Sequence, residues 1–171
     1  MADKVLFITT QDLKDKSIID GVVDSSKMLQ FIEVAQDVHI QNYIGSSLYR
    51  KLSSLILTDE IDLPENSKYE LLLTDHIKPM LIWYAQRSFL PFAAFKVSNG
   101  GIYKHRSENA DSAVQDEVSF LMSKIDETAE HYTHRFNEFM RYNGNDYDEW
   151  TDNENEDMRP QKDVNLTSWN L

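Results

Sequence analysis

The chain has 171 residues, 41% of them hydrophobic and 27% charged, a length and composition typical of one globular domain. Seventeen Lys and Arg against 29 Asp and Glu give a net charge of -12, which argues against a protein that coats itself in nucleic acid. The sequence has no cysteine, which excludes disulfide frameworks and thiol catalysis and is typical of a reducing cytoplasm. Since no apolar run reaches ~20 residues, we expect neither a signal peptide nor a membrane span.

The charge is unevenly distributed along the chain. Residues 76–107 contain five basic residues and no acidic one, whereas the segments before and after this block carry an excess of acids. Residues 144–171 contain eight acids and only two bases. The sequence is therefore acidic, with one basic block inside it.

The N-terminal part of the chain predicts two helices. Thr10 is expected to cap a short helical turn over residues 11–16, because a threonine side chain can accept a hydrogen bond from a free N–H of the first turn. Apolar residues at three-and-four spacing predict a second helix over residues 27–43, capped by Ser25 or Ser26.

A glycine separates the second predicted helix from the third. Gly45 is expected to end the second helix, because glycine adopts a positive φ without steric cost. A shorter helix is predicted over residues 47–56, followed by a solvated loop over residues 58–67.

The densest apolar stretch, residues 67–95, predicts the central helix. Pro79 lies inside it, where the missing N–H and the ring predict a kink or a break, and Pro91 is expected to end or bend the helix again. Short alternating segments around Asn99-Gly100 then predict a β-hairpin over about residues 94–106.

The last helix has the clearest signals. Ser112 and Gln115 have the form of a capping box, and the helical repeat continues until Asn143-Gly144. Residues 144–171 are polar, acidic and without period, which is the composition of a tail that does not fold alone. The fold predicted is mainly α, a small helical bundle with a long C-terminal helix, one β-hairpin insertion and an extended acidic tail, divided into a helical domain (1–143) and a partner-binding tail (144–171).

The basic hairpin is the leading candidate for a binding surface. It can be an ordinary solvated hairpin whose lysines discourage edge pairing, or a cationic projection that docks on an acidic surface of another protein or another copy, or a contact to nucleic acid in a lumen. The candidate residues are Lys96, Asn99, Gly100, Gly101, Tyr103, Lys104, His105 and Arg106.

Aromatic residues of the tail form a second candidate set. Tyr147, Trp150 and Trp169 lie in segments with little apolar content of their own, where an exposed aromatic side chain can anchor a partner. The alternative is a tail that packs back onto its own domain.

Catalytic and metal-binding patterns are weak. His131 and His134 share a helix with Glu127 and Glu130, but no Glu stands three residues before a His, as the di-iron bundles require. These four residues lie opposite the apolar stripe, which favours a solvated or subunit-facing polar face. We therefore expect no enzyme activity, no metal and no cofactor.

Three segments of the chain resemble the head-tail connector (adaptor) proteins of tailed bacteriophages, especially those of phages of Bacteroidetes-type hosts, including crAss-like ones. They are residues 12–52, with AQD and IG…LY, residues 69–104, with a helix-Pro-helix pattern followed by KVSNGG, and residues 117–140.

The resemblance implies a structural virion protein at the neck of the capsid vertex, made in the bacterial host cytoplasm. It implies a ring of usually twelve copies that docks under the portal protein, extends the DNA channel without sequence-specific binding, and meets tail or stopper proteins. Residues 97–103 would be its hairpin loop, and the segment from Gly144 onward would bind the partner. The basic block between acidic flanks would then make neighbouring subunits complementary.

Two other classes remain open from the sequence. One is a small helical metal-binding protein or enzyme that uses His131 and His134. The other is an acidic host-directed regulator, such as a mimic of DNA.

Overall fold

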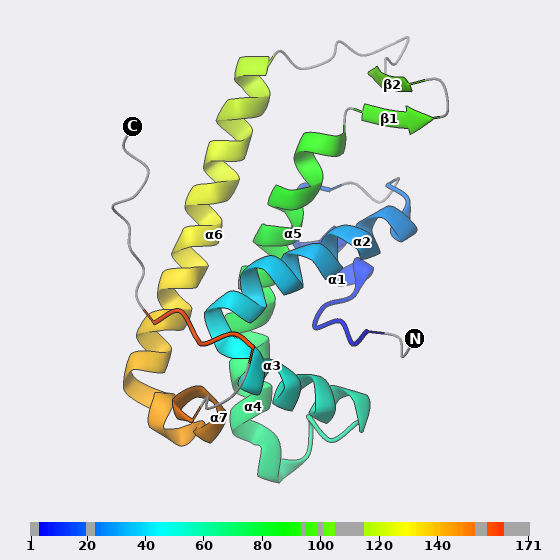
Figure 1. The fold of residues 1–171 in the computed structure, drawn as a ribbon. Helices are drawn as coiled ribbons and strands as arrows, with labels where there is room; N and C mark the ends of the chain where they lie inside the picture. Colours follow the sequence, from blue (N-terminus) through cyan, green and yellow to red (C-terminus); the bar gives the residue numbers. More distant parts are fainter. Residues whose placement is uncertain are drawn as a thin grey trace.

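The computed structural model describes residues 4–19, 23–93, 95–98, 101–104, 115–152 and 157–162. It is mainly helical, which confirms the predicted class. In Figure 1 helix α5 stands in the centre, α2 crosses it on one side and α6 runs along the other. Within the described ranges, every helix is too short or too polar to span a membrane.

The first two helices begin at Thr10 and Ser25, two of the residues that the sequence suggested as caps, and their caps lie one residue earlier. Helix α1 (Thr10–Lys16) is capped by Thr9, which forms a full capping box with the third residue of the helix. Helix α2 (Ser25–Ala35) is capped by Asp24, whose carboxylate accepts the N–H of Ser26 at 2.9 Å. In both cases the predicted serine or threonine lies inside the first turn, and the residue before it supplies the acceptor.

A π-helical turn (Gln36–Ile40) joins α2 to α3 (Gln41–Leu57). Gly45 breaks α3 with φ 78° and ψ 159°, so the positive φ predicted for this glycine is confirmed. The chain resumes a helical course after the break, as the prediction of a further helix over residues 47–56 requires.

The central helical stretch is continuous through Pro79. A short 3₁₀ turn (Pro64–Asn66) leads into α4 (Ser67–Leu71), a π-helical turn (Leu72–Ile77) and α5 (Lys78–Ala93). The helix does not break at Pro79. Instead, the π-helical turn lies immediately before this proline, and the N–H of Lys78 donates to the carbonyl of Leu73, five residues earlier. Helix α5 ends two residues after Pro91.

Beyond α5, strand β1 (Phe95–Ser98) pairs antiparallel with β2 (Gly101–Lys104), with Val97 opposite Ile102 and Ser98 opposite Gly101. Figure 1 places these strands at the end of α5 that is farthest from α7. Asn99 and Gly100 lie outside the described residues.

Helix α6 (Gln115–Asn143) has 29 residues and is followed by a 3₁₀ turn (Gly144–Asp146) and the short helix α7 (Asp148–Thr151). The predicted cap Ser112 lies outside the described residues. The helix ends at the predicted glycine, but the chain after Gly144 folds back onto the bundle.

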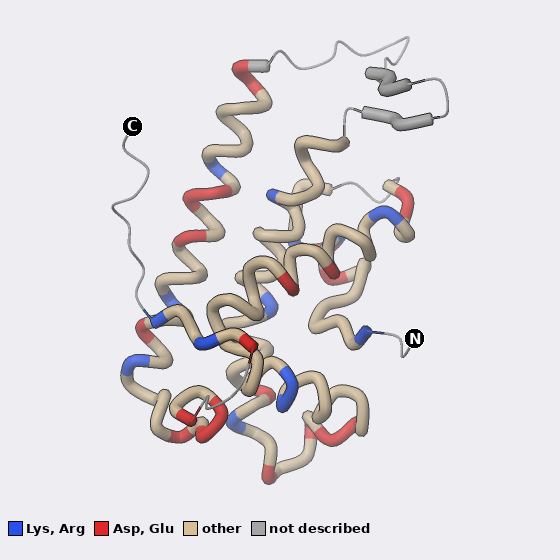
Figure 2. Tube along the Cα trace, in the orientation of Figure 1, with Lys and Arg blue, Asp and Glu red and all other residues tan. Residues whose placement is uncertain are grey.

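The core lies where α2 and α6 pack around α5, and it continues between α3 and α7. Its largest fully buried side chains include Met28, Ile32, Ile44, Leu48, Leu72, Met80, Leu81 and Phe136. One buried polar residue, Gln36, ties the N-terminal segment to this core, because its side chain accepts the N–H of Phe7 at 2.8 Å and donates to the carbonyl of Val5 at 2.9 Å. Charged residues lie on the outside, with acids gathered around α7 (Figure 2).

Candidate interaction surfaces

The hairpin candidates divide between described and undescribed positions. Lys96 lies opposite Tyr103 in the β-ladder, and Gly101 and Lys104 are the ends of β2. Asn99, Gly100, His105 and Arg106 lie outside the described residues, as does Trp169 of the tail.

Two of the three tail aromatics pack into the domain. Tyr147 and Trp150 are 2% and 5% exposed. The Tyr147 hydroxyl donates to the carbonyl of Lys68 at 2.9 Å, and Trp150 stands edge-on to Phe136 with ring centroids 5.6 Å apart. Burial raises the pKa of Tyr147 to about 12. Of the two interpretations of these aromatics, the packing of Tyr147 and Trp150 matches a tail that folds back onto its own domain, so the helical body extends past residue 143.

A second part of the tail, residues 157–162, lies across the break in α3, and we call it the strap. At an unbroken helix the N–H of Ser46 would bond to the carbonyl of Asn42. Here the N–H of Ser46 donates to the carbonyl of Met158 at 2.9 Å, and the carbonyl of Asn42 accepts the N–H of Gln161 at 3.1 Å. The strap therefore satisfies two backbone groups, the Ser46 N–H and the Asn42 carbonyl, that the Gly45 break releases.

Side chains reinforce the strap. The Ser46 hydroxyl accepts the N–H of Met158 at 3.0 Å, and the Asn42 amide donates to the side-chain oxygen of Gln161 at 2.8 Å. A Cβ on Gly45 would lie 2.7 Å from Cδ of Pro160, so only glycine leaves room for this proline. The α3 break and the strap thus form one structural unit.

A groove runs between α2 and α6, with α5 as its floor. Each of α2 and α6 packs against α5, and the space between them is open to solvent. Two apolar side chains of its lining are exposed, Val34 (44%) and Phe92 (61%). The groove is lined by Phe31, Val34, His39, Arg87, Ser88, Pro91, Phe92 and Met122.

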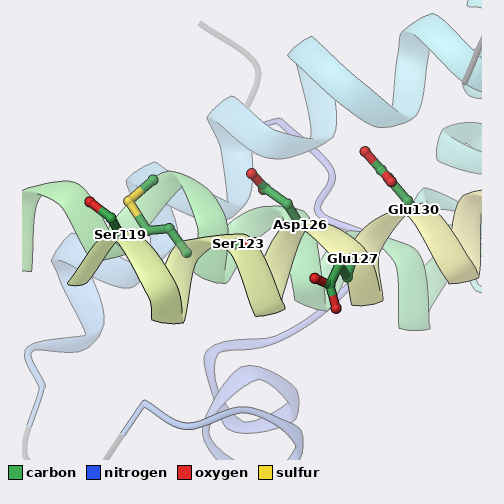
Figure 3. A pocket seen from close by; sticks show the side chains of 6 residues that line it. Ser119, Ser123, Asp126, Glu127 and Glu130 are labelled. Atoms are coloured by element: carbon green, nitrogen blue, oxygen red, sulfur yellow. The ribbon is translucent and has the colours of Figure 1, made fainter. Parts of the chain in front are cut away.

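The α6 side of this groove continues into a polar hollow. Figure 3 shows Ser119, Ser123, Asp126, Glu127 and Glu130 on successive turns of α6, where they line it together with Met122. Met122 also lines the apolar groove, so the two openings are adjacent. Arg87, which lines the groove, forms an ion pair at 2.5 Å with Asp126, which lines the polar hollow.

One titratable ring lies at the inner end of the groove. His39 stacks on Tyr84, with ring centroids 4.1 Å apart and planes 10° from parallel. Burial, aided by the positive charge of Arg87, lowers the pKa of His39 to about 4. His39 is therefore neutral at pH 7 and acts as a flat, weakly polar part of the wall.

The N-terminal third of α6 forms a separate exposed surface. The buried apolar residues of α6, which are Ile125, Ala129, Phe136 and Met140, all follow residue 124. The preceding turns carry Phe120 at 66% exposure and Leu121 at 37%. Among the described residues, this part of the helix therefore leaves large apolar side chains exposed.

The histidine pair of α6 lies on the outer face of that helix. His131 and His134 are both exposed, and His131 meets Tyr132 edge-on at 5.5 Å. Glu127 pairs with Lys124 at 2.8 Å rather than with either histidine. In the part of the chain that the structure describes, no three potential ligands gather at one point.

Sequence reasoning missed the strap and the groove. The strap residues Met158, Pro160 and Gln161 have no compositional signal, since their main contacts are backbone groups. Val34, an apolar residue of α2 outside the apolar stripe read from the sequence, was the available signal for the groove.

These features define a small helical domain with exposed apolar surfaces on α2, α5 and α6. The model of DUF6712, a family of unknown function, matches residues 40–159, and the chain belongs to that family. The matched range includes the α3 break, all of α5 and α6, and the first strap residues. Neither the curated proteins nor the solved structures contain a match to this chain.

Proposed function

We propose that this protein is a subunit of the head-tail connector ring of a tailed bacteriophage. In this role it docks under the portal, extends the DNA channel and joins the capsid vertex to tail or stopper proteins in the virion. The proposal rests on the resemblance of residues 12–52, 69–104 and 117–140 to that family and on the mainly helical fold.

The exposed N-terminal third of α6 is the observation that carries the proposal. A helix of 29 residues is about 43 Å long, and its buried positions begin only at Ile125. Exposed Phe120 and Leu121 on the first turns favour a contact with another chain, because helices are stabilised mainly by packing an apolar face. A neighbouring subunit in a closed ring would supply that contact.

The charge pattern fits a channel component. A net charge of -12 repels phosphate, so DNA can pass without adhering. The hairpin, with Lys96 and Lys104 on its strands, would then meet an acidic surface of a neighbour or of the portal, where opposite charge sets the docking register.

The test is the mass of the native particle. The purified chain is measured by native mass spectrometry, alone and with the cognate portal ring, and rings or portal-bound copies are expected. Phe120→Glu should abolish them, because it places a charge in the proposed contact, whereas Leu57→Glu, at a residue 74% exposed on the end of α3, should not.

A chain that stays monomeric at high concentration and does not bind the portal would contradict the proposal. Rings that form equally well with Phe120→Glu would exclude the α6 contact. Circular dichroism of both variants confirms that each is folded.

A further inference from the structure

The α3 break has the groups of a site that recognises a peptide backbone. The Ser46 N–H and the Asn42 carbonyl, which the break releases, lie beside the Ser46 hydroxyl and the Asn42 amide, and all four bond to the strap. Gln41 donates to the Ser46 hydroxyl at 2.9 Å and so holds it in place. Ser46 is only 1% exposed, so its polar groups are shielded from water. The break therefore offers donors and acceptors at fixed positions, which lowers the entropy lost when a ligand binds.

Two strap residues supply the complementary groups. Met158 contributes its backbone, since its carbonyl accepts the N–H of Ser46 at 2.9 Å and its N–H donates to the Ser46 hydroxyl at 3.0 Å. Gln161 contributes its N–H to the carbonyl of Asn42 at 3.1 Å and its side-chain oxygen to the Asn42 amide at 2.8 Å. The first of these positions needs a backbone N–H, and the second needs a glutamine side chain as well.

A proline fits between these two positions. Pro160 lies over Gly45, where the absent side chain leaves room, since a Cβ there would be 2.7 Å from Cδ of the proline. Proline has no N–H to leave unpaired against the helix, and its fixed φ reduces the conformational freedom lost on binding. The pattern that the break recognises is therefore a residue other than proline, any residue, and then Pro-Gln.

The strap is held at the surface of the domain. Met158 and Pro160 are half-buried, and the other four residues of the strap are exposed. Lys162 lies over the ring of Trp150, with Nζ 5.5 Å from the centroid, a contact that is weak at an exposed site. Segments with few buried contacts open locally at low cost. The strap therefore holds the break largely because, as part of the same chain, it has a high effective concentration there.

We propose that the α3 break is a peptide-binding site for a segment of another protein that carries the Pro-Gln pattern, and that the strap occupies this site as a displaceable ligand of the same chain. The partner segment bonds its backbone to Ser46 and Asn42 and places its proline over Gly45. The proposal goes beyond the connector role and holds whether or not copies of the chain form a ring.

The probe is a synthetic peptide with the sequence of residues 157–162, added to a full-length chain whose own strap is released. Met158→Pro with Gln161→Pro releases it, because these changes remove two N–H donors of the strap and leave every residue of the break unchanged. Binding is measured by the fluorescence anisotropy of the labelled peptide and by the NMR shift of the Ser46 amide. We expect the peptide to bind this variant at least tenfold more tightly than the natural chain, where the strap competes.

Further substitutions in the released variant test which groups recognise the peptide. Gly45→Ala should weaken binding at least tenfold, because the methyl group takes the place of the proline ring, whereas Ser54→Ala, at an exposed position of α3 beyond the break, should not change it. Asn42→Ala should weaken binding several-fold, but it should have no effect on a peptide that carries alanine in place of Gln161. The Asn42 comparison keeps the test valid if Gly45→Ala does not fold.

Equal binding to the released variant and to the natural chain, or no binding to a released variant that circular dichroism shows to be folded, would overturn the proposal. Pro160→Glu with Gln161→Ala releases the strap by another route and repeats the measurement if the first pair of substitutions prevents folding. The natural chain, added in place of the peptide, should not bind the released variant, because its strap fills its own break. A mixed dimer in native mass spectrometry would instead give the site to a second copy and overturn its assignment to another protein.

Discussion

Gly45→Ala tests whether the α3 break and the strap form one unit. Gly45 has φ 78° and ψ 159°, a region of backbone conformation that is almost confined to glycine. The added methyl group would also lie 2.7 Å from Cδ and 2.8 Å from Cγ of Pro160. The substitution therefore strains α3 and pushes the strap away from it.

The expected loss of stability has two parts. A residue other than glycine in this conformation costs about 1–3 kcal/mol. Displacing the strap removes its hydrogen bonds to Ser46 and Asn42, each worth about 1 kcal/mol, and leaves the backbone groups of the break to water. The free energy of unfolding should fall by about 3–5 kcal/mol, a large share of the 5–15 kcal/mol typical of a domain.

Urea unfolding of four proteins measures this loss: the natural chain, Gly45→Ala, Pro160→Ala and the double variant. Because Pro160→Ala removes the ring carbons nearest the new methyl group, Gly45→Ala should cost less in that background, with a coupling of about 1–2 kcal/mol. A Gly45→Ala protein within about 0.5 kcal/mol of the natural chain would refute the reasoning. A coupling near zero would show that the strap does not press on Gly45.

Three further predictions concern the core. Folding lowers the pKa of His39 to about 4, so the folded protein holds this ring neutral. The free energy of unfolding should therefore fall by about 2 kcal/mol as the pH drops from 6.5 to 4. His39→Gln should flatten this part of the pH profile of urea unfolding. Gln36→Leu leaves the N–H of Phe7 without its partner and should cost about 1–3 kcal/mol, with faster hydrogen exchange at Phe7, whereas an unchanged exchange rate would contradict the bond. Trp150→Ala should cost about 3–5 kcal/mol by thermal or urea unfolding, because the ring is 5% exposed against Phe136, and a loss below about 1 kcal/mol would contradict its place in the core.

Much of the helical framework could be predicted from local signals. The positive φ of Gly45 and the end of α6 at Gly144 follow from glycine at the end of an apolar repeat. The course of the chain at Pro79 could not be predicted, because a π-helical turn immediately before the proline takes up the irregularity, and the period of the sequence does not distinguish that turn from a kink.

The candidate surfaces were harder to predict. The acidic composition of residues 144–171 favoured an exposed tail, yet Tyr147 and Trp150 are buried. Tyr147 bonds to the carbonyl of Lys68, which lies 79 residues away in the sequence, and Trp150 packs on Phe136 of α6. Composition does not encode such pairing. The strap is harder still, because its contacts to α3 span 112 and 119 residues, and two of its hydrogen bonds to α3 join backbone groups.

The strap also sets an order of events during synthesis. The ribosome makes α3 early, with the backbone groups of Ser46 and Asn42 at the Gly45 break still unpaired, and their partners Met158 and Gln161 follow more than a hundred residues later. Contacts between such distant segments form slowly, because a long loop must close first. The hydrogen bonds that the strap gives to the α3 break therefore form only after Met158 and Gln161 have left the ribosome, and a chain that stops before the strap never forms them.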